Sequence, residues 1–126
     1  MTKYCLDASF MINYLNGVEE SRKFIEELKA DDQILLPIIA KSEVKYSQKD
    51  IDKFDQLETI DFTDKDLDLS IKIVQRLEKD GNRTSLFDTL IAAQSVKTES
   101  TLVTFDQDFE KLEEYPGFEY KKLSRK

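Results

Sequence analysis

Short apolar runs alternate along this chain with longer segments in which apolar residues recur every three or four positions. Lys3–Leu6, Ile34–Ile38 and Thr101–Phe105 are runs of the first kind, and continuous apolar runs of this length are typical of strands buried on both faces. Thr59–Phe62 and Glu119–Leu123 are weaker strand candidates. The pattern therefore predicts four to five short strands.

The segments between the predicted strands have helical periodicity. Asp7 is placed to cap a helix that continues to Leu15 and stops at Asn16-Gly17. Leu67, Ile71, Val74 and Leu77 recur at helical spacing, which predicts that they form the buried stripe of a later helix ending before Gly81. The remaining predicted helices are 18–30, 39–57, 86–96 and 106–114.

Alternation of strands and helices indicates βαβ units with right-handed crossovers. We therefore expect a three-layer α/β/α fold, in which helices cover both faces of a mostly parallel sheet of four to five strands. No internal repeat or second apolar pattern divides the chain, so residues 1–126 are expected to form a single domain.

The composition removes several kinds of chemistry. The chain has no His, which excludes Ser-His-Asp hydrolysis and His-ligated zinc, and one Cys, Cys5, which excludes a disulfide framework. Cys5 lies in an apolar run and is expected to be a buried, inert thiol. No apolar stretch approaches the roughly 20 residues of a membrane span. Asp7 interrupts the N-terminal run before a signal peptide could form, so a cytoplasmic location is expected.

Four acidic residues are expected to meet at one rim of the predicted sheet. Asp7 and Asp106 each follow a predicted strand, Glu43 lies near the start of a helix, and Asp88 lies in the first turn of another. In a parallel sheet, strand ends and the helix starts that follow them share one edge, where ligands bind. Like charges crowded there are unfavourable unless something positive lies between them, which favours a metal site.

Each of these acids also has a purely structural interpretation. Asp7 and Asp106 are also suited to capping the helices that follow them, and Asp88 to a capping box that begins at Ser85. Glu43, taken alone, fits a solvated helix face. The chain is acidic, with a net charge of −7, and is therefore a weak non-specific binder of nucleic acid. Divalent ions bound at the rim would offset part of that charge.

Other residues near the predicted rim are candidates for supporting roles. Ser9 and Thr104 are candidates to hold a metal-bound water, and Asp108 is a further acid that fits a helix start equally well. Tyr46 is a candidate for stacking on a base, whereas Phe87 and Phe105 are expected in the core. Three basic residues close to these acids in the sequence are candidates for phosphate contact: Arg83, which is the main candidate, Lys41 and Lys45.

Several segments resemble PIN-domain proteins, in the family's order and over nearly the whole chain. Tyr4-Cys5-Leu6-Asp7-Ala8-Ser9 resembles the family's opening, and Ser42-Glu43-Val44 matches its central Glu. Gly81 followed by Asp88-Thr89-Leu90-Ile91-Ala92-Ala93 is similar to its most recognisable segment. Leu102-Val103-Thr104-Phe105-Asp106-Gln107-Asp108-Phe109 resembles its Thr-x-Asp-x-Asp-Phe ending.

The resemblance implies a PIN-like fold and an endoribonuclease that hydrolyses single-stranded or structured RNA. Asp7, Asp88 and Asp106 would hold metal directly or through water, and Glu43 would orient the site or hold a second ion. Oxygen ligands without His favour Mg²⁺ or Mn²⁺ over zinc. The subfamily most similar is the VapC-type toxins, which implies an antitoxin partner and a homodimer.

One segment departs from that subfamily. Only fifteen residues separate Glu43 from Thr59, where VapC-like proteins usually carry a longer helical pair that helps grip the antitoxin. Val44, Ile51 and Phe54 are candidate apolar contacts for an antitoxin, and the alternative is that they pack on the chain's own core or on a homodimer partner.

Two other protein classes that gather carboxylates differ from this chain in the position of their motifs. A receiver domain places two adjacent acids after its first strand, whereas only Asp7 stands there. A haloacid-dehalogenase-like phosphatase would use Asp106-x-Asp108, but that motif normally opens its fold and here only eighteen residues follow Asp108. An RNA-processing PIN nuclease without an antitoxin, and a catalytically silent PIN-fold binding module, stay open as alternatives.

Overall fold

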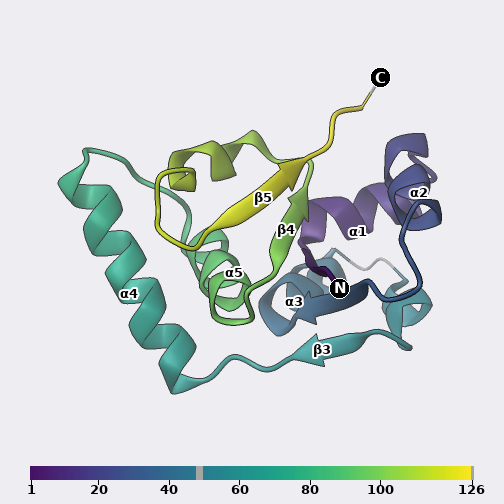
Figure 1. Cartoon of the computed structure of the whole chain (residues 1–126), viewed down its shortest axis with the longest axis horizontal. Coiled ribbons are helices and arrows are strands. Elements are labelled where there is room, and N and C mark those ends of the chain that lie inside the picture. Colours follow the sequence, from purple (N-terminus) through teal and green to yellow (C-terminus); the bar gives the residue numbers. More distant parts are fainter. Residues whose placement is uncertain (48–49, 126) are drawn as a thin grey trace.

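Five parallel strands form the central sheet of this protein (Figure 1). The computed structural model describes residues 1–47 and 50–125. All four neighbouring strand pairs are parallel, in the spatial order β3-β2-β1-β4-β5. The predicted three-layer α/β/α fold is thereby confirmed. The strands are β1 (Lys3–Leu6), β2 (Gln33–Pro37), β3 (Glu58–Ile60), β4 (Thr101–Thr104) and β5 (Glu119–Lys122).

The order of the strands fixes where a site can form. The chain runs from β1 to β2 to β3 and then returns to β4 and β5 on the other side of β1. The strand order therefore reverses between β1 and β4, and the crevice beyond the carboxyl ends of two such strands is where open α/β sheets bind ligands. Asp7 follows β1 directly, and Asp106 lies two residues after β4.

The helices between the strands agree with the sequence pattern except in length and type. The predicted helix 18–30 ends at Glu26, and the predicted helix 39–57 is a shorter α-helix followed by a 3₁₀ turn, with residues 48–49 outside the described residues. The predicted helix 106–114 is also 3₁₀. The elements are α1 (Ala8–Leu15), α2 (Glu19–Glu26), α3 (Ile38–Tyr46), η1 (Ile51–Phe54), α4 (Asp64–Lys79), α5 (Leu86–Lys97) and η2 (Gln107–Leu112).

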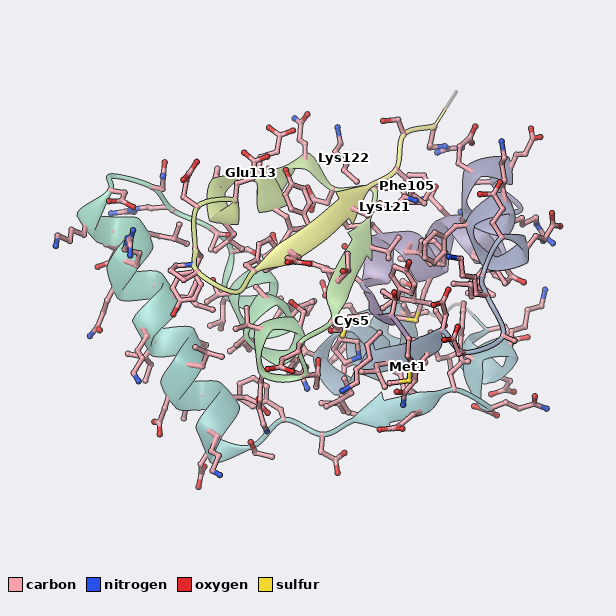
Figure 2. All side chains as sticks on the ribbon, viewed as in Figure 1. Met1, Cys5, Phe105, Glu113, Lys121 and Lys122 are labelled. Carbon is pink, nitrogen blue, oxygen red and sulfur yellow. The ribbon has the colours of Figure 1, made fainter. Side chains whose placement is uncertain are left out.

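The core lies between the sheet and the helices that contact it, while charged side chains project outward around the ribbon (Figure 2). Cys5, predicted as a buried thiol, is fully buried. Val44, Ile51 and Phe54 are also buried, so they are core residues and the idea that they contact an antitoxin is wrong. Among the described residues, no helix combines the length and the apolar character needed to cross a membrane.

Helix α4 buries a different face from the one its apolar spacing predicts. Leu67 and Ile71 are 46% and 47% exposed, whereas Asp66, Ser70 and Ile73 are buried. Two polar residues occupy the face turned inward because Ser70 hydrogen-bonds the backbone of α4 itself and Asp66 has partners beyond the helix. The buried stripe predicted from Leu67 and Ile71 was therefore wrong.

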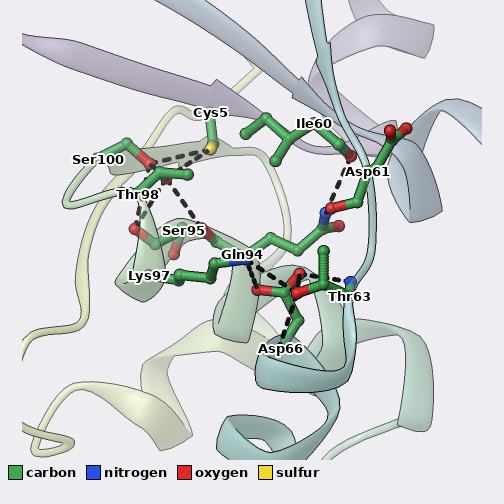
Figure 3. Close-up of polar contacts among 10 residues, drawn as sticks. All are labelled: Cys5, Ile60, Asp61, Thr63, Asp66, Gln94, Ser95, Lys97, Thr98 and Ser100. Atoms are coloured by element: carbon green, nitrogen blue, oxygen red, sulfur yellow. Dashed lines mark hydrogen bonds and ion pairs between the residues drawn. The ribbon is translucent and has the colours of Figure 1, made fainter.

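Those partners and Asp66 form what we call the Asp66 network: Asp66, Thr63 and Lys97, with Gln94 beside them on α5 (Figure 3). The fully buried Asp66 carboxylate lies 3.2 Å from the Lys97 ammonium and accepts the Thr63 backbone N–H at 2.8 Å in a capping box. Gln94 donates to the backbone oxygens of residues 60 and 61 at 3.0 and 3.2 Å. The network thus joins the end of α5 to the chain between β3 and α4.

Candidate active site

Asp7 is held at the end of β1 by three hydrogen bonds. One carboxylate oxygen accepts the Phe10 backbone N–H at 2.9 Å, which caps α1, and the Ser9 hydroxyl at 2.8 Å. The other oxygen accepts the Thr104 hydroxyl from β4. Only 4% of Asp7 is exposed. Asp7 therefore both caps α1 and contacts the end of β4.

The two strand ends are joined by hydroxyl groups. The Thr104 Oγ1 accepts the Asp106 backbone N–H at 2.9 Å, and the Ser9 Oγ accepts the Phe105 backbone N–H at 2.9 Å. These bonds fix the backbone on which Asp106 stands relative to Asp7. The predicted role of Ser9 and Thr104 in holding a metal-bound water stays a prediction, but both hydroxyls already bind Asp7 and the neighbouring backbone.

Three carboxylates meet above this arrangement. One oxygen each from Asp88, Asp106 and Asp108 lie within 4.8 Å of one another. Asp106 caps η2 by accepting the Asp108 backbone N–H at 2.8 Å, which turns Asp108 back toward it. Asp88 lies in the first turn of α5, where its own N–H donates to the Ser85 hydroxyl. From the sequence, Asp108 was only a minor candidate. Its position two residues after Asp106 was the feature that could have identified it as a rim residue.

Electrostatic coupling brings Glu43 and Asp7 into the same group. Burial raises the pKa of Glu43, and the charges of Asp88 and Asp106 raise it further. Burial likewise raises the pKa of Asp7 to about 7 against the effect of its three donors, and Asp106 adds to the rise. Hereafter the acidic rim means Glu43, Asp88, Asp106 and Asp108, with Asp7 beneath them.

The rim is short of positive charge. The pKa of Asp88 is raised mainly by burial and then by Asp106 and Asp108, and is lowered by the Ser85 hydrogen bond and by the charge of Lys111. No ion pair in residues 1–47 and 50–125 includes a rim carboxylate. Lys111 was not singled out from the sequence, because nothing in its local pattern separates it from other surface lysines.

The basic and aromatic candidates are placed differently from the acids. Arg83 lines a cavity of about 340 Å³ with Leu77 and Thr84 rather than one shared with the rim, and the Lys41 ammonium lies 3.4 Å from the Thr59 hydroxyl. Phe87 was expected in the core but is 48% exposed, because it lies in the first turn of α5 beyond the sheet. Phosphate contact by Arg83 stays a prediction.

The rim carboxylates suit a small divalent ion. Two ligands of one Mg²⁺, each about 2.1 Å from it, lie at most about 4.2 Å apart, so oxygens already within 4.8 Å need only a small contraction. The donors are all carboxylate oxygens, which Mg²⁺ and Mn²⁺ prefer. The chain has no His that would favour zinc.

Comparison with known proteins places this fold and site in a family. Residues 4–115 match the PIN domain family, and the chain belongs to it. No curated protein matches the chain. The matched range includes Asp7, Glu43, Asp88 and Asp106, whose functional roles stay a prediction.

Solved structures with the same fold come from toxin–antitoxin systems. VapBC2 from Rickettsia felis, bound to a DNA fragment from its promoter, gives a TM-score of 0.82 at 21% identity, covering 98% of this chain and 100% of the other. DNA-bound VapBC from Salmonella typhimurium gives 0.79 at 20% identity, covering 97% and 98%. Mycobacterium tuberculosis VapC20, described as a toxin that cleaves the sarcin-ricin loop, gives 0.64 at 14% identity, covering 85% and 92%.

Proposed function

We propose that this protein is a Mg²⁺- or Mn²⁺-dependent endoribonuclease that acts as the toxin of a toxin–antitoxin pair. The observation that carries the proposal is the convergence of Asp88, Asp106 and Asp108 within 4.8 Å, with no basic side chain paired to them among the described residues. Such a group is stabilised by a cation from outside the chain.

The rim residues have distinct roles in this proposal. Asp88, Asp106 and Asp108 would hold a divalent ion, whose chemistry when bound is to activate water and offset charge on the leaving oxygen. Glu43 would orient the water or the substrate from the second turn of α3. Asp7 would fix the β1 and β4 ends through Ser9 and Thr104, so that Asp106 keeps its position.

RNA as substrate and a toxin role are supported by the solved relatives. VapC20 is described as cleaving the sarcin-ricin loop, and the Rickettsia felis and Salmonella typhimurium structures are VapBC complexes. In this proposal water attacks the phosphate and the 2′-hydroxyl does not take part. The products then carry 5′-phosphate and 3′-hydroxyl ends.

An antitoxin would inhibit the enzyme most simply by supplying the missing positive charge. An inserted Arg or Lys side chain pairs with the rim carboxylates and excludes the metal. Apolar contacts must then come from residues other than Val44, Ile51 and Phe54, which are buried in the toxin's own core.

A homodimer also fits the surface of α4. Leu67 and Ile71 lie one turn apart and are each about half exposed. Asp64, Asp66 and Asp68 outnumber Lys65 toward the start of this helix, and Lys72, Arg76 and Lys79 outnumber Glu78 toward its end. An antiparallel pairing of two α4 helices about a two-fold axis therefore buries the apolar residues and opposes unlike charges. Analytical ultracentrifugation of Ile71→Lys tests this, and an unchanged dimer would contradict it.

The nuclease is tested by measuring cleavage of single-stranded RNA in Mg²⁺ by a matched set of variants. Asp88→Asn and Asp106→Asn should each lower the rate by at least about 100-fold, since loss of even an outer support of a metal ligand has effects of about 10- to 100-fold. Asp7→Asn should also abolish cleavage.

The control is Asp68→Asn, which removes the same charge from an exposed position on α4 and should cleave like the wild type. Equal activity in Asp106→Asn and Asp68→Asn would reject the site. If no RNA is cleaved while the protein still binds a neighbouring gene product, the protein is a silent binding module. Cleavage without such a partner, and without growth arrest on expression, would leave an RNA-processing nuclease.

A further inference from the structure

A cavity lined by two aromatic side chains adjoins the acidic rim. Its volume is about 240 Å³, and Ile39, Ser42, Glu43, Tyr46 and Phe87 line it. The first four are spaced along one face of α3, and Phe87 reaches the cavity from the first turn of α5. We call this cavity the aromatic pocket.

The two rings of the aromatic pocket are exposed and have no aromatic or cationic partner among the described residues. Tyr46 is 89% exposed and Phe87 is 48% exposed. Within the described part of the chain, neither ring stacks on another ring, and neither lies beneath a cation. Exposed rings lining a hollow are typical of a binding surface rather than of scattered surface residues.

The position of the aromatic pocket limits what it can bind. Glu43 belongs both to the pocket and to the acidic rim, and Phe87 is followed directly by the rim residue Asp88. An occupant therefore lies next to the group that would hold the metal. Among the residues that the structure describes, no basic side chain lines the pocket, and a phosphate finds no counter-charge on that lining.

The chemistry of the lining fits a nucleobase. Flat rings offer faces on which any base can stack, and the Glu43 carboxyl can accept a hydrogen bond from an exocyclic amino group. The volume of about 240 Å³ is below the roughly 300–1,000 Å³ of pockets for drug-sized ligands. A single base is smaller than such ligands, so this volume suits one base.

We propose that the aromatic pocket binds one unpaired base of the RNA substrate, next to the phosphate that is cleaved. This inference rests on the proposed nuclease function and names the form of RNA it acts on: a strand with at least one unstacked base. Stacking also supplies affinity that an acidic chain with a net charge of −7 does not obtain from phosphate contacts alone.

The first test is a fluorescence measurement without metal, so that no RNA is cut. The chain contains no Trp, so Phe87→Trp introduces a single reporter within the pocket. A short single-stranded oligoribonucleotide in EDTA should quench its emission, and an oligonucleotide of the same length with abasic sites should not. The control is Leu86→Trp, whose neighbouring position is 68% exposed but does not line the pocket, and it should show no quenching.

Two results of the fluorescence measurement overturn the proposal. Equal quenching by the abasic strand would mean that the pocket does not read a base. No quenching by RNA, together with quenching by a co-purified antitoxin, would make the pocket a protein-docking site.

The second test separates the pocket from the chemistry. Tyr46→Ala should raise KM by about 5- to 100-fold, the effect of losing one stacked base, with little change in kcat. Tyr46→Phe keeps the ring and should restore the wild-type KM. Because Tyr46 is 89% exposed, neither variant should affect folding.

The two tests together distinguish failure of the pocket from failure of the nuclease. Metal-dependent cleavage with an unchanged KM in Tyr46→Ala would overturn the pocket and retain the nuclease. Base-dependent quenching of Phe87→Trp without cleavage in either Mg²⁺ or Mn²⁺ would reject the nuclease and retain the base site.

Discussion

The molecule has two groups of carboxylates away from full solvent exposure, with Asp108 the one exposed member, and their charges are compensated in opposite ways. In the Asp66 network, a fully buried carboxylate has a Lys97 ammonium 3.2 Å away and a capping box from Thr63. In the acidic rim, burial and then the charges of neighbouring carboxylates raise the pKa values of Glu43 and Asp88, and no ion pair of the described residues includes a rim carboxylate. A carboxylate whose cation comes from its own chain serves the fold, whereas uncompensated carboxylates at a strand edge are suited to an external cation.

The largest effect expected from this difference is the pH dependence of Asp7 in metal-free protein. Burial raises the pKa of Asp7 from 3.8 to about 7, so the folded carboxyl holds its proton more tightly than the unfolded one. Its contribution to stability is therefore fully present below about pH 4 and is lost as the pH rises through about 7. At about 1.4 kcal/mol for each pKa unit, the loss is on the order of 4 kcal/mol.

Urea denaturation between pH 4 and pH 8 in EDTA measures this loss. In Asp7→Asn the position no longer titrates, and Asn still caps α1, so the decline should be smaller than in the wild type. The exposed Asp68→Asn should follow the wild-type curve. A decline in Asp7→Asn as steep as in the wild type would assign the pH dependence to other groups.

Removal of the internal cation should have the next largest effect. Lys97→Met leaves the buried Asp66 without its partner, and loss of one member of a buried ion pair is unfavourable by about 3–5 kcal/mol. Because the Lys97 side chain is 36% exposed, we expect about 3 kcal/mol in the free energy of unfolding. The double variant Asp66→Asn/Lys97→Met should recover part of the loss. If Lys97→Met lowers the free energy of unfolding by less than about 1 kcal/mol, Lys97 does not compensate the charge of Asp66, and the two carboxylate groups do not differ in this respect.

The external cation should stabilise the protein through the rim alone. A ligand that binds only the folded state at 100 times its Kd adds about 2.7 kcal/mol. Mg²⁺ or Mn²⁺ should therefore raise the melting temperature of the wild type and of Lys97→Met equally. Asp88→Asn should reduce this response, and an unchanged response in that variant would mean that Asp88 is a helix residue rather than a metal ligand.

The smallest expected effect is the relief of repulsion in the rim without metal. Asp88→Asn removes one of the charges that raise the pKa of Glu43, while its backbone N–H still donates to Ser85. We expect the metal-free variant to be more stable than the wild type by about 0.5 kcal/mol, as for relief of one partly exposed like-charge contact. Calorimetry in EDTA measures it, and a loss of stability would contradict a repulsive rim.

The positions of the acids that follow the strand ends could be predicted from the sequence. Apolar runs followed by Asp7 and by Asp106 predict strands and the acids beyond them, and parallel pairing then requires those acids to share an edge. The compensation of Asp66 by Lys97 was not predictable, because it depends on how α4 packs against α5. Hydrophobic spacing predicted that Leu67 is buried, and this was wrong. The polar contacts of Asp66, which the spacing does not show, decide which face of α4 is buried.

The aromatic pocket illustrates a second limit. Tyr46 was identified as a stacking candidate from its residue type, but Phe87 was assigned to the core because it lies in an apolar helix. The exposure of Phe87 follows from where α5 begins relative to α3, which is a long-range property of the fold. Asp108 joins the rim from the 3₁₀ turn η2, in which Asp106 accepts the Asp108 backbone N–H, a contact that spacing alone does not specify.

In the proposed function, the acidic rim uses a divalent ion to direct water against a phosphodiester bond in RNA. The most direct measurement is the chemistry of the cleaved ends, after incubation of a single-stranded RNA with the purified protein in Mg²⁺ and in EDTA. This function predicts cleavage in Mg²⁺ alone, with 5′-phosphate and 3′-hydroxyl ends. Products with 2′,3′-cyclic phosphates, or full activity in EDTA with contaminating nuclease removed, would contradict it.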